Sequence, residues 1–187
     1  MIRIFVVAAL ISFLSASAFA GAIGAFGSYW DTEDAGESYG YGLRLASTSD
    51  PAGFLELRLS RFDNFEDDEN GNYSSLEVIP IDLGMTLNMT PADSLQFYIG
   101  GGGSYYMMES EVDTPSGKRD PDIDDEWGWY GLAGIKLELS PSLHLFAEGV
   151  YRRVEGSFPA DKLEDVDSDV DFKLDGWGAN AGLLLMF

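Results

Sequence analysis

The side chains of this sequence that could do chemistry are almost all carboxylates. There are 32 Asp and Glu against 11 Lys and Arg, a single His at position 144 and no Cys, so the formal net charge is −21. The lack of Cys excludes thiolate metal sites, thiol nucleophiles and disulfides. Phosphate binding requires clustered Lys and Arg, so the charge argues against nucleic acid as a partner. Because 45% of the residues are hydrophobic, the chain is too apolar for a disordered acidic tail, and the acids must be segregated along it.

Two acidic runs have a spacing that could hold a hard cation. In the run over 165–171 every second residue is Asp. The run over 120–126 alternates in the same way as far as Asp124 and then continues with two more acids. Such arrays repel unless they are solvated or bridged by a cation with oxygen ligands such as Ca²⁺. The EF-hand pattern is not met. Val170 occupies the position where that loop requires Gly, and Gly176 occupies the position of its bidentate Glu. A solvated loop and weak Ca²⁺ binding both stay open, and no other cofactor is expected. The candidate ligands are Asp165, Asp167, Asp169, Asp171, Asp122 and Asp124.

The first twenty residues have the pattern of a cleaved export signal. Met1–Arg3 carries one positive charge, Ile4–Leu14 is an unbroken apolar run of eleven, and Ala18-Phe19-Ala20 matches an A-x-A cleavage site. Eleven apolar residues are too few to cross a bilayer as a helix, which needs about 20. We therefore expect residues 1–20 to be a signal peptide and residues 21–187 to form one domain.

The elements that carry these acids have the period of β-strands. From Gly21 onward apolar residues fall on alternate positions. Tight connections that contain Pro, over 49–53, 90–94 and 140–142, alternate with four long acidic ones. This order predicts an all-β, antiparallel up-and-down sheet that closes into an eight-stranded barrel. The expected strands are Ala22–Trp30, Tyr39–Thr48, Phe54–Arg61, Leu76–Met89, Leu95–Met108, Trp127–Leu139, Leu143–Val154 and Gly176–Phe187.

The two faces of these strands differ in chemistry. One face is apolar and ends in aromatic residues near the long connections, among them Tyr39, Trp127 and Trp177. The other face holds equal numbers of acids and bases, which suits a sealed interior because buried charges need partners. A soluble barrel would turn the apolar face inward, but the aromatic girdle and the balanced charges favour a membrane barrel that turns it to lipid. The expected lumen charge network is Arg44, Glu56, Arg58, Asp82, Lys136, Glu138, Glu148 and Arg152.

The net charge is concentrated in the long connections. Counted over 31–38, 61–75, 109–126 and 153–175, these segments carry −4, −4, −6 and −5. We call them together the acidic crown. The sequence therefore predicts a neutral barrel with a charge of −19 at one end.

The end of the chain alternates and closes on an aromatic residue. Leu183, Leu185 and Phe187 resemble the β-signal that the outer-membrane assembly machinery recognises. With the export signal, the eight strands and the Pro-containing turns, the whole of 21–187 resembles the small eight-stranded outer-membrane β-barrels, the OmpA-like and OmpX-like proteins. The resemblance implies location in the outer membrane of a Gram-negative bacterium, with the tight turns in the periplasm and the long loops outside. Implied partners are the assembly machinery, outer-membrane lipid and lipopolysaccharide.

The interior of an eight-stranded barrel is just wide enough for side chains to fill, so a plugged, charge-paired lumen is expected. This favours a monomer with a membrane-integrity or surface-interaction role. A narrow, cation-preferring, porin-like pore is the first alternative, and a surface adhesin or divalent-cation-binding receptor is the second. Catalysis is not expected. The resemblance would place a catalytic His near the outer half, whereas His144 follows the tight turn over 140–142 at the opposite end.

Overall fold

The computed structural model describes residues 21–33, 35–50, 53–69, 72–92, 94–114, 117–119, 125–158 and 170–187. The predicted signal peptide, residues 1–20, lies outside them and stays a prediction. The strands formed by the described residues are β1 (Gly21–Thr32), β2 (Gly36–Asp50), β3 (Gly53–Glu69), β4 (Asn72–Ala92), β5 (Leu95–Thr114), β6 (Gly117–Arg119), β7 (Glu126–Ser140), β8 (Leu143–Phe158), β9 (Val170–Lys173) and β10 (Gly176–Met186).

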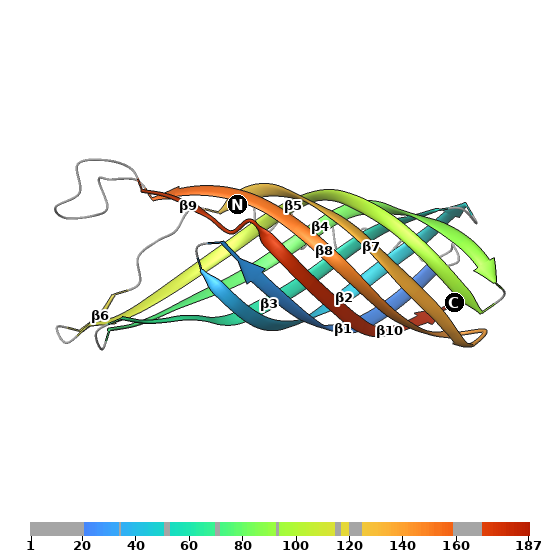
Figure 1. Ribbon diagram of the computed structural model, residues 1–187, viewed down its shortest axis with the longest axis horizontal. Helices are drawn as coiled ribbons and strands as arrows, with labels where there is room; N and C mark the ends of the chain where they lie inside the picture. The colour runs from blue at the N-terminus through green and yellow to red at the C-terminus, as the bar shows by residue number, and fades with distance from the viewer. Residues whose placement is uncertain are drawn as a thin grey trace.

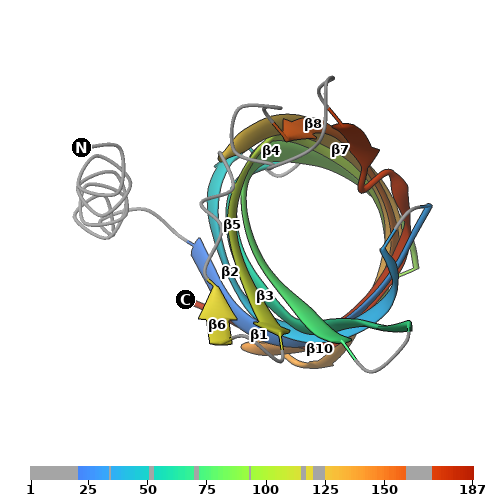
Figure 2. The same cartoon turned by 90° about the vertical axis from the view of Figure 1, so that its left-hand side faces the viewer.

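Eight of these strands form the wall of a closed barrel, which Figure 2 shows end-on. Each wall strand pairs antiparallel with the next, in the order β1, β2, β3, β4, β5, β7, β8 and β10. The last strand closes the ring because it pairs with β8 on one side and with β1 on the other. At this seam Gly21 and Phe187 exchange two backbone hydrogen bonds of 2.9 Å. The predicted eight-stranded antiparallel barrel is confirmed.

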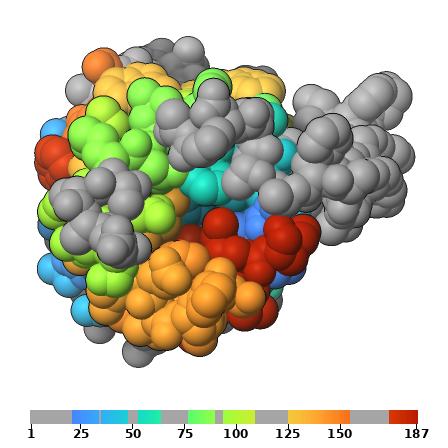
Figure 3. Space-filling view, turned by 90° about the vertical axis from the view of Figure 1, so that its right-hand side faces the viewer, coloured from blue at the N-terminus to red at the C-terminus, as the bar shows by residue number. Residues whose placement is uncertain are grey.

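The tight turns and the C-terminus gather at one end of the barrel, and the longest hairpins extend from the other (Figure 1). Figure 3 views the tight-turn end, where the β7–β8 turn and β10 lie side by side at the mouth. The short strands β6 and β9 are not part of the eight-stranded ring. β6 pairs with the end of β5, and β9 pairs with the end of β8. Among the described residues no helix is long and apolar enough to span a membrane.

The wall strands run further at the long-hairpin end than the alternation predicts. β3 continues to Glu69 and β4 begins at Asn72, so most of the loop expected over 62–75 is a hairpin ladder. β5 and β8 likewise extend into the loops expected after them. The reason is that hairpin pairing satisfies backbone groups and does not require an apolar face, so it continues where the side chains become polar. The acidic crown therefore begins on strands.

Burial alternates along the wall, with even-numbered side chains inward and odd-numbered ones outward with few exceptions. Outward aromatic rings stack in pairs near the long-hairpin end, such as Tyr29 with Tyr39 at 5.3 Å and Tyr105 with Trp127 at 4.9 Å between centroids. This position and spacing suit an aromatic girdle at a membrane interface. The aromatic girdle consists of Tyr29, Tyr39, Tyr41, Tyr105, Trp127, Trp129, Tyr151 and Trp177.

Three clusters of buried hydrophobic residues lie in the barrel, and a polar band separates the two larger ones. Along β3 the inward residues run from Phe54 through Glu56 and Arg58 to Phe62, so this strand passes from one cluster through charges to the other. The lower cluster, at the tight-turn end, comprises Ala22, Phe26, Ala46, Phe54, Phe146 and Leu184. The upper cluster, at the long-hairpin end, comprises Trp30, Phe62, Val78, Tyr106, Met108, Val154 and Leu174.

Candidate functional site in the lumen

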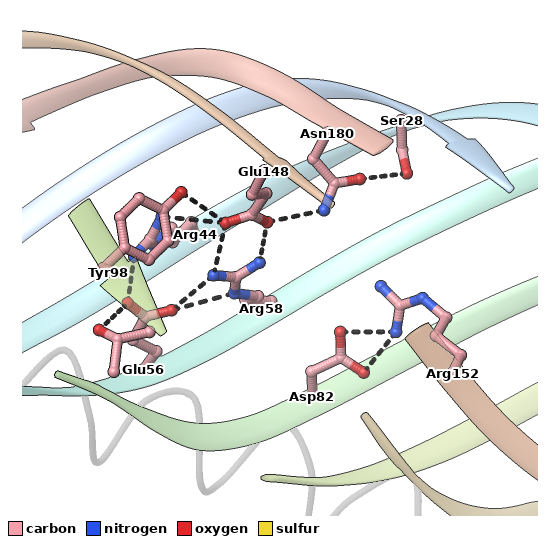
Figure 4. Close-up of polar contacts among 10 residues, drawn as sticks. Ser28, Arg44, Glu56, Arg58, Asp82, Tyr98, Glu148, Arg152 and Asn180 are labelled. Atoms are coloured by element: carbon pink, nitrogen blue, oxygen red, sulfur yellow. Dashed lines mark hydrogen bonds and ion pairs between the residues drawn. The ribbon is translucent and has the colours of Figure 1, made fainter. Parts of the chain in front are cut away.

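Four buried charges cross the lumen between the two apolar clusters (Figure 4). Arg58 of β3 contacts two carboxylates. Its Nε and Nη2 donate to Glu56 Oε2 at 3.0 and 2.8 Å, and its Nη2 also donates to Glu148 Oε2 at 3.1 Å. Arg44 of β2 pairs with Glu56, and its Nη1 lies 3.7 Å from Glu148 Oε2. We call these four residues the ion quartet.

The ion quartet joins opposite sides of the barrel. Glu56 and Arg58 lie on β3 and Glu148 on β8, and these strands are four positions apart around the ring in either direction. None of the four is more than 5% exposed. A contact across the full width at this depth requires long side chains from both walls, and Arg and Glu supply them.

Neutral side chains complete the coordination of both quartet carboxylates. Thr86 donates its hydroxyl to Glu56 at 2.7 Å, and Tyr98 donates its hydroxyl to Glu148 at 2.7 Å. The Asn180 amide also donates to Glu148, at 2.8 Å. Each carboxylate therefore accepts hydrogen bonds from several donors, which a buried anion needs in order to be stable.

A second ion pair lies apart from the quartet, beneath the upper cluster (Figure 4). Nη1 of Arg152 on β8 donates to both Asp82 oxygens, at 3.0 and 2.9 Å. Ser104 donates to Asp82 at 2.7 Å, and the Arg152 guanidinium lies 5.6 Å from the centre of the Trp30 ring. The pair thus connects the polar band to the apolar cluster above it.

The structure places the last two predicted network residues differently. Lys136 is buried, but its Nζ donates to the side-chain oxygen Oδ1 of Asn88 at 2.9 Å and lies over the rings of Phe54 and Tyr98. Glu138 is exposed beside the tight turn and forms no ion pair with another described residue. The alternation places a residue on the correct face but does not tell its depth, so the expected pairing of Glu138 inside the lumen is not found. Seven of the eight predicted charges are buried, with one more base than acid.

Aromatic rings share the lumen with these charges; Tyr98 and Tyr130 were expected to point inward, whereas the inward rings of Phe26, Trp30, Phe62, Tyr106 and Phe146 were missed. Several of these rings lie against glycines of other strands. A Cβ on Gly84 would collide with the Tyr130 hydroxyl, and one on Gly134 with the Tyr98 ring. The same relation holds for Phe26 at Gly42, Phe62 at Gly40 and Tyr106 at Gly128. The signal was present in the sequence, because these aromatic residues occupy even positions like the charged ones.

The predicted assembly signal lies on the outer surface at the seam. Leu183 and Leu185 of β10 point outward and are about half exposed, and the terminal Phe187 is exposed as well. Leu183 lies opposite Ala25 of β1 and Leu145 of β8. Recognition by an assembly machinery stays a prediction.

The predicted Ca²⁺ ligands belong to segments whose side chains are not described. Asp122, Asp124, Asp165, Asp167 and Asp169 lie outside the described residues, and for Asp171 the description covers the backbone in β9. Ca²⁺ binding therefore stays a prediction. Within the described part of the chain, no group of three or more His, Asp or Glu could hold a metal ion.

Several solved structures have the same architecture as this chain. Neisserial surface protein A, NspA, matches with a TM-score of 0.61 and 13% identity, over 89% of this chain and 97% of that one. Ail of Yersinia pestis, in complex with the heparin analogue sucrose octasulfate, matches at 0.59 and 10%, over 90% and 99%. The N-terminal β-barrel domain of Pseudomonas aeruginosa OprF matches at 0.52 and 16%, over 90% and 97%. Identities this low establish the fold alone.

A comparison with curated proteins finds no match. A family model does match, and it covers residues 6–184. The model describes the outer membrane protein beta-barrel domain. The chain therefore belongs to this family of outer-membrane β-barrels.

Proposed function

We propose that this barrel is a non-conducting surface protein of the outer membrane, with a membrane-integrity or surface-interaction role and its acidic crown outside the cell. The observation that carries the proposal is the ion quartet, which joins β3 to β8 across the lumen. Apolar clusters lie on both sides of it. An ion crossing the barrel would have to separate paired, buried charges and also pass two layers of packed rings, and both steps are costly.

The alternative is a narrow, cation-preferring pore. It is supported by the charge of the acidic crown, −19, because such a field raises the local concentration of cations at the mouth. This alternative requires the quartet to exchange partners and the apolar clusters to open. The proposed closed barrel requires neither movement.

The charge of the crown also indicates the kind of partner. The Ail structure contains sucrose octasulfate, which is a polyanion. A surface of −19 repels polyanions, so we do not extend that ligand to this chain and propose cationic partners instead. Catalysis is not part of the proposal, because the lone His144 is buried near the tight-turn end and six of the seven buried lumen charges are ion-paired.

Single-channel recording of the refolded barrel in planar bilayers tests the proposal. We expect no discrete current steps, with or without Ca²⁺. Protease resistance of the wall strands in the same bilayers serves as the control for insertion. Discrete cation-selective steps from inserted protein would contradict the closed barrel and support the pore.

A further inference from the structure

One buried cation of the lumen has no acid as its partner. The ion quartet contains two bases and two acids, and the second ion pair is likewise neutral. Lys136 of β7 is the remaining buried charge of the predicted network and is 4% exposed. Within the described part of the chain its ammonium pairs with no carboxylate; it donates to Asn88 Oδ1 at 2.9 Å and lies 4.4 Å from the centre of the Phe54 ring. A buried charge that lacks a counter-charge is costly, so the surroundings of Lys136 favour a ligand that brings one.

Two side-chain amides next to Lys136 offer further hydrogen-bond donors. Gln96 of β5 lies directly opposite Lys136 in the ladder and shares its inward parity. The Asn88 amide accepts from Lys136 through its oxygen, so its NH₂ group is left for another acceptor. Both amides are half-buried and lie on either side of the tight turn over 90–94, so a solute can reach them from the tight-turn end.

His144 adds a buried nitrogen that has no partner. It lies on β8 opposite Glu138, at a position diagonal to Lys136, and residues at such diagonal positions are about 7–8 Å apart. His144 is 7% exposed, and among the described residues its Nδ1 has no hydrogen-bond partner. Buried polar atoms are normally hydrogen-bonded, so this nitrogen indicates a group that would complete it.

These nitrogen groups occupy one side of the lumen. We call Asn88, Gln96, Lys136 and His144 the donor cluster; they lie on β4, β5, β7 and β8, four consecutive wall strands. The lower apolar cluster covers the other side at this end, because most of its members come from β1, β2, β3 and β10. Glu138 lies at the exposed edge of the donor cluster, beside the tight turn over 140–142. Its charge repels a second negative charge on a ligand, so a monovalent anion suits the donor cluster better than a divalent one.

We propose that the donor cluster binds a small monovalent carboxylate, which enters from the tight-turn end. One carboxylate would balance the one unpaired ammonium, and its two oxygens would accept hydrogen bonds from the amides and from Nδ1 of His144. The inference goes beyond the proposed function, since it concerns the end opposite the acidic crown and holds whether or not the barrel conducts ions.

NMR of the imidazole ring tests the proposal. Because His144 is the only His of the chain, ¹⁵N-labelled histidine in the barrel in lipid nanodiscs gives the signals of one ring. The probe is sodium acetate, which replaces sodium sulfate at constant ionic strength and fixed pH; sulfate is the divalent anion that Glu138 should exclude. We expect a saturable shift of the ring signals with half-saturation in the millimolar range. An unchanged spectrum, or a shift that does not saturate, would overturn the proposal.

Matched barrel variants locate the site. Lys136→Met removes the unpaired charge without breaking an ion pair and should weaken acetate binding at least about tenfold. Arg61→Met removes the same charge near the long-hairpin end and should change binding less than about twofold. Equal effects of these two variants would refute the assignment to the donor cluster.

A third variant has the opposite expected sign. Glu138→Gln removes the repelling charge from an exposed position and should tighten acetate binding about threefold. Weaker acetate binding by this variant would contradict the role of Glu138 in selecting the ligand. The amide signals of the wall strands report that each variant is folded.

Discussion

Ion pairs in the lumen and ion pairs in the acidic crown contribute differently to the stability of this molecule. In the lumen, Arg58 is buried and contacts two carboxylates, whereas Arg61, three residues on in the same strand, is exposed and also contacts two. Inside the barrel the contacts decide whether the fold persists, since a buried charge that loses its partner stays desolvated and uncompensated. In the crown each pair competes with solvent, and the charges mainly shape the field that a partner meets.

The largest expected effect comes from breaking the ion quartet. Arg58→Ala leaves Arg44 as the one remaining base of the quartet against Glu56 and Glu148, and it should lower the free energy of unfolding by about 3–5 kcal/mol. Arg61→Ala is the control and should cost no more than about 1 kcal/mol. Urea unfolding in lipid vesicles measures both, and equal midpoints for the two variants would contradict the distinction.

The second ion pair, Asp82 with Arg152, tests whether the stability of the barrel requires charged side chains in the lumen or only requires that no buried charge is left unpaired. Asp82→Ala alone leaves Arg152 buried and unpaired and should also cost about 3 kcal/mol or more. Replacing both, Asp82→Leu with Arg152→Met, should recover most of that loss, because a packed apolar pair has no desolvation cost. The same urea titration checks this, and a double variant as unstable as the single one would show that the charges themselves are required.

A smaller effect is expected where rings lie on glycine. Gly84→Ala places a methyl group against the Tyr130 hydroxyl and the Gly101 carbonyl and should cost about 1–3 kcal/mol. Gly149→Ala, on the outer face with open space around it, is the control and should be nearly neutral. Thermal unfolding compares the two variants, and a neutral Gly84→Ala would show that the ring has room to shift.

The smallest effect on stability is expected in the crown. Asp165→Asn with Asp167→Asn should change the free energy of unfolding by less than about 0.5 kcal/mol. Calorimetric titration with CaCl₂ tests the other reading of this run, because heat at millimolar Ca²⁺ that the double variant lacks would assign ligands there. No heat from the unmodified barrel would end the Ca²⁺ proposal.

Alternation predicted the barrel and its two faces because the side-chain period of a strand is independent of everything else in the fold. It did not predict depth. Glu138 and Glu148 have the same parity, yet one lies at the mouth and the other at the centre, because depth depends on strand tilt and register. The rings of Trp30 and Phe146 also occupy even positions and point inward, but the predicted lumen network contains charged residues only and so does not include them. The added length of β3 and β4 was missed because backbone pairing leaves no mark in hydropathy.

The seam between β1 and β10 has a consequence for how the molecule forms. Gly21 and Phe187 are hydrogen-bonded neighbours in space and lie at opposite limits of the described chain. Contacts of such sequence separation form late and slowly, because the entropy of closing the loop must be paid first. Any fragment that lacks β10 would leave two unpaired margins, on β1 and β8, and unpaired margins aggregate. Pairing of the last strand therefore closes the barrel and removes the unpaired strand edges through which an intermediate would aggregate.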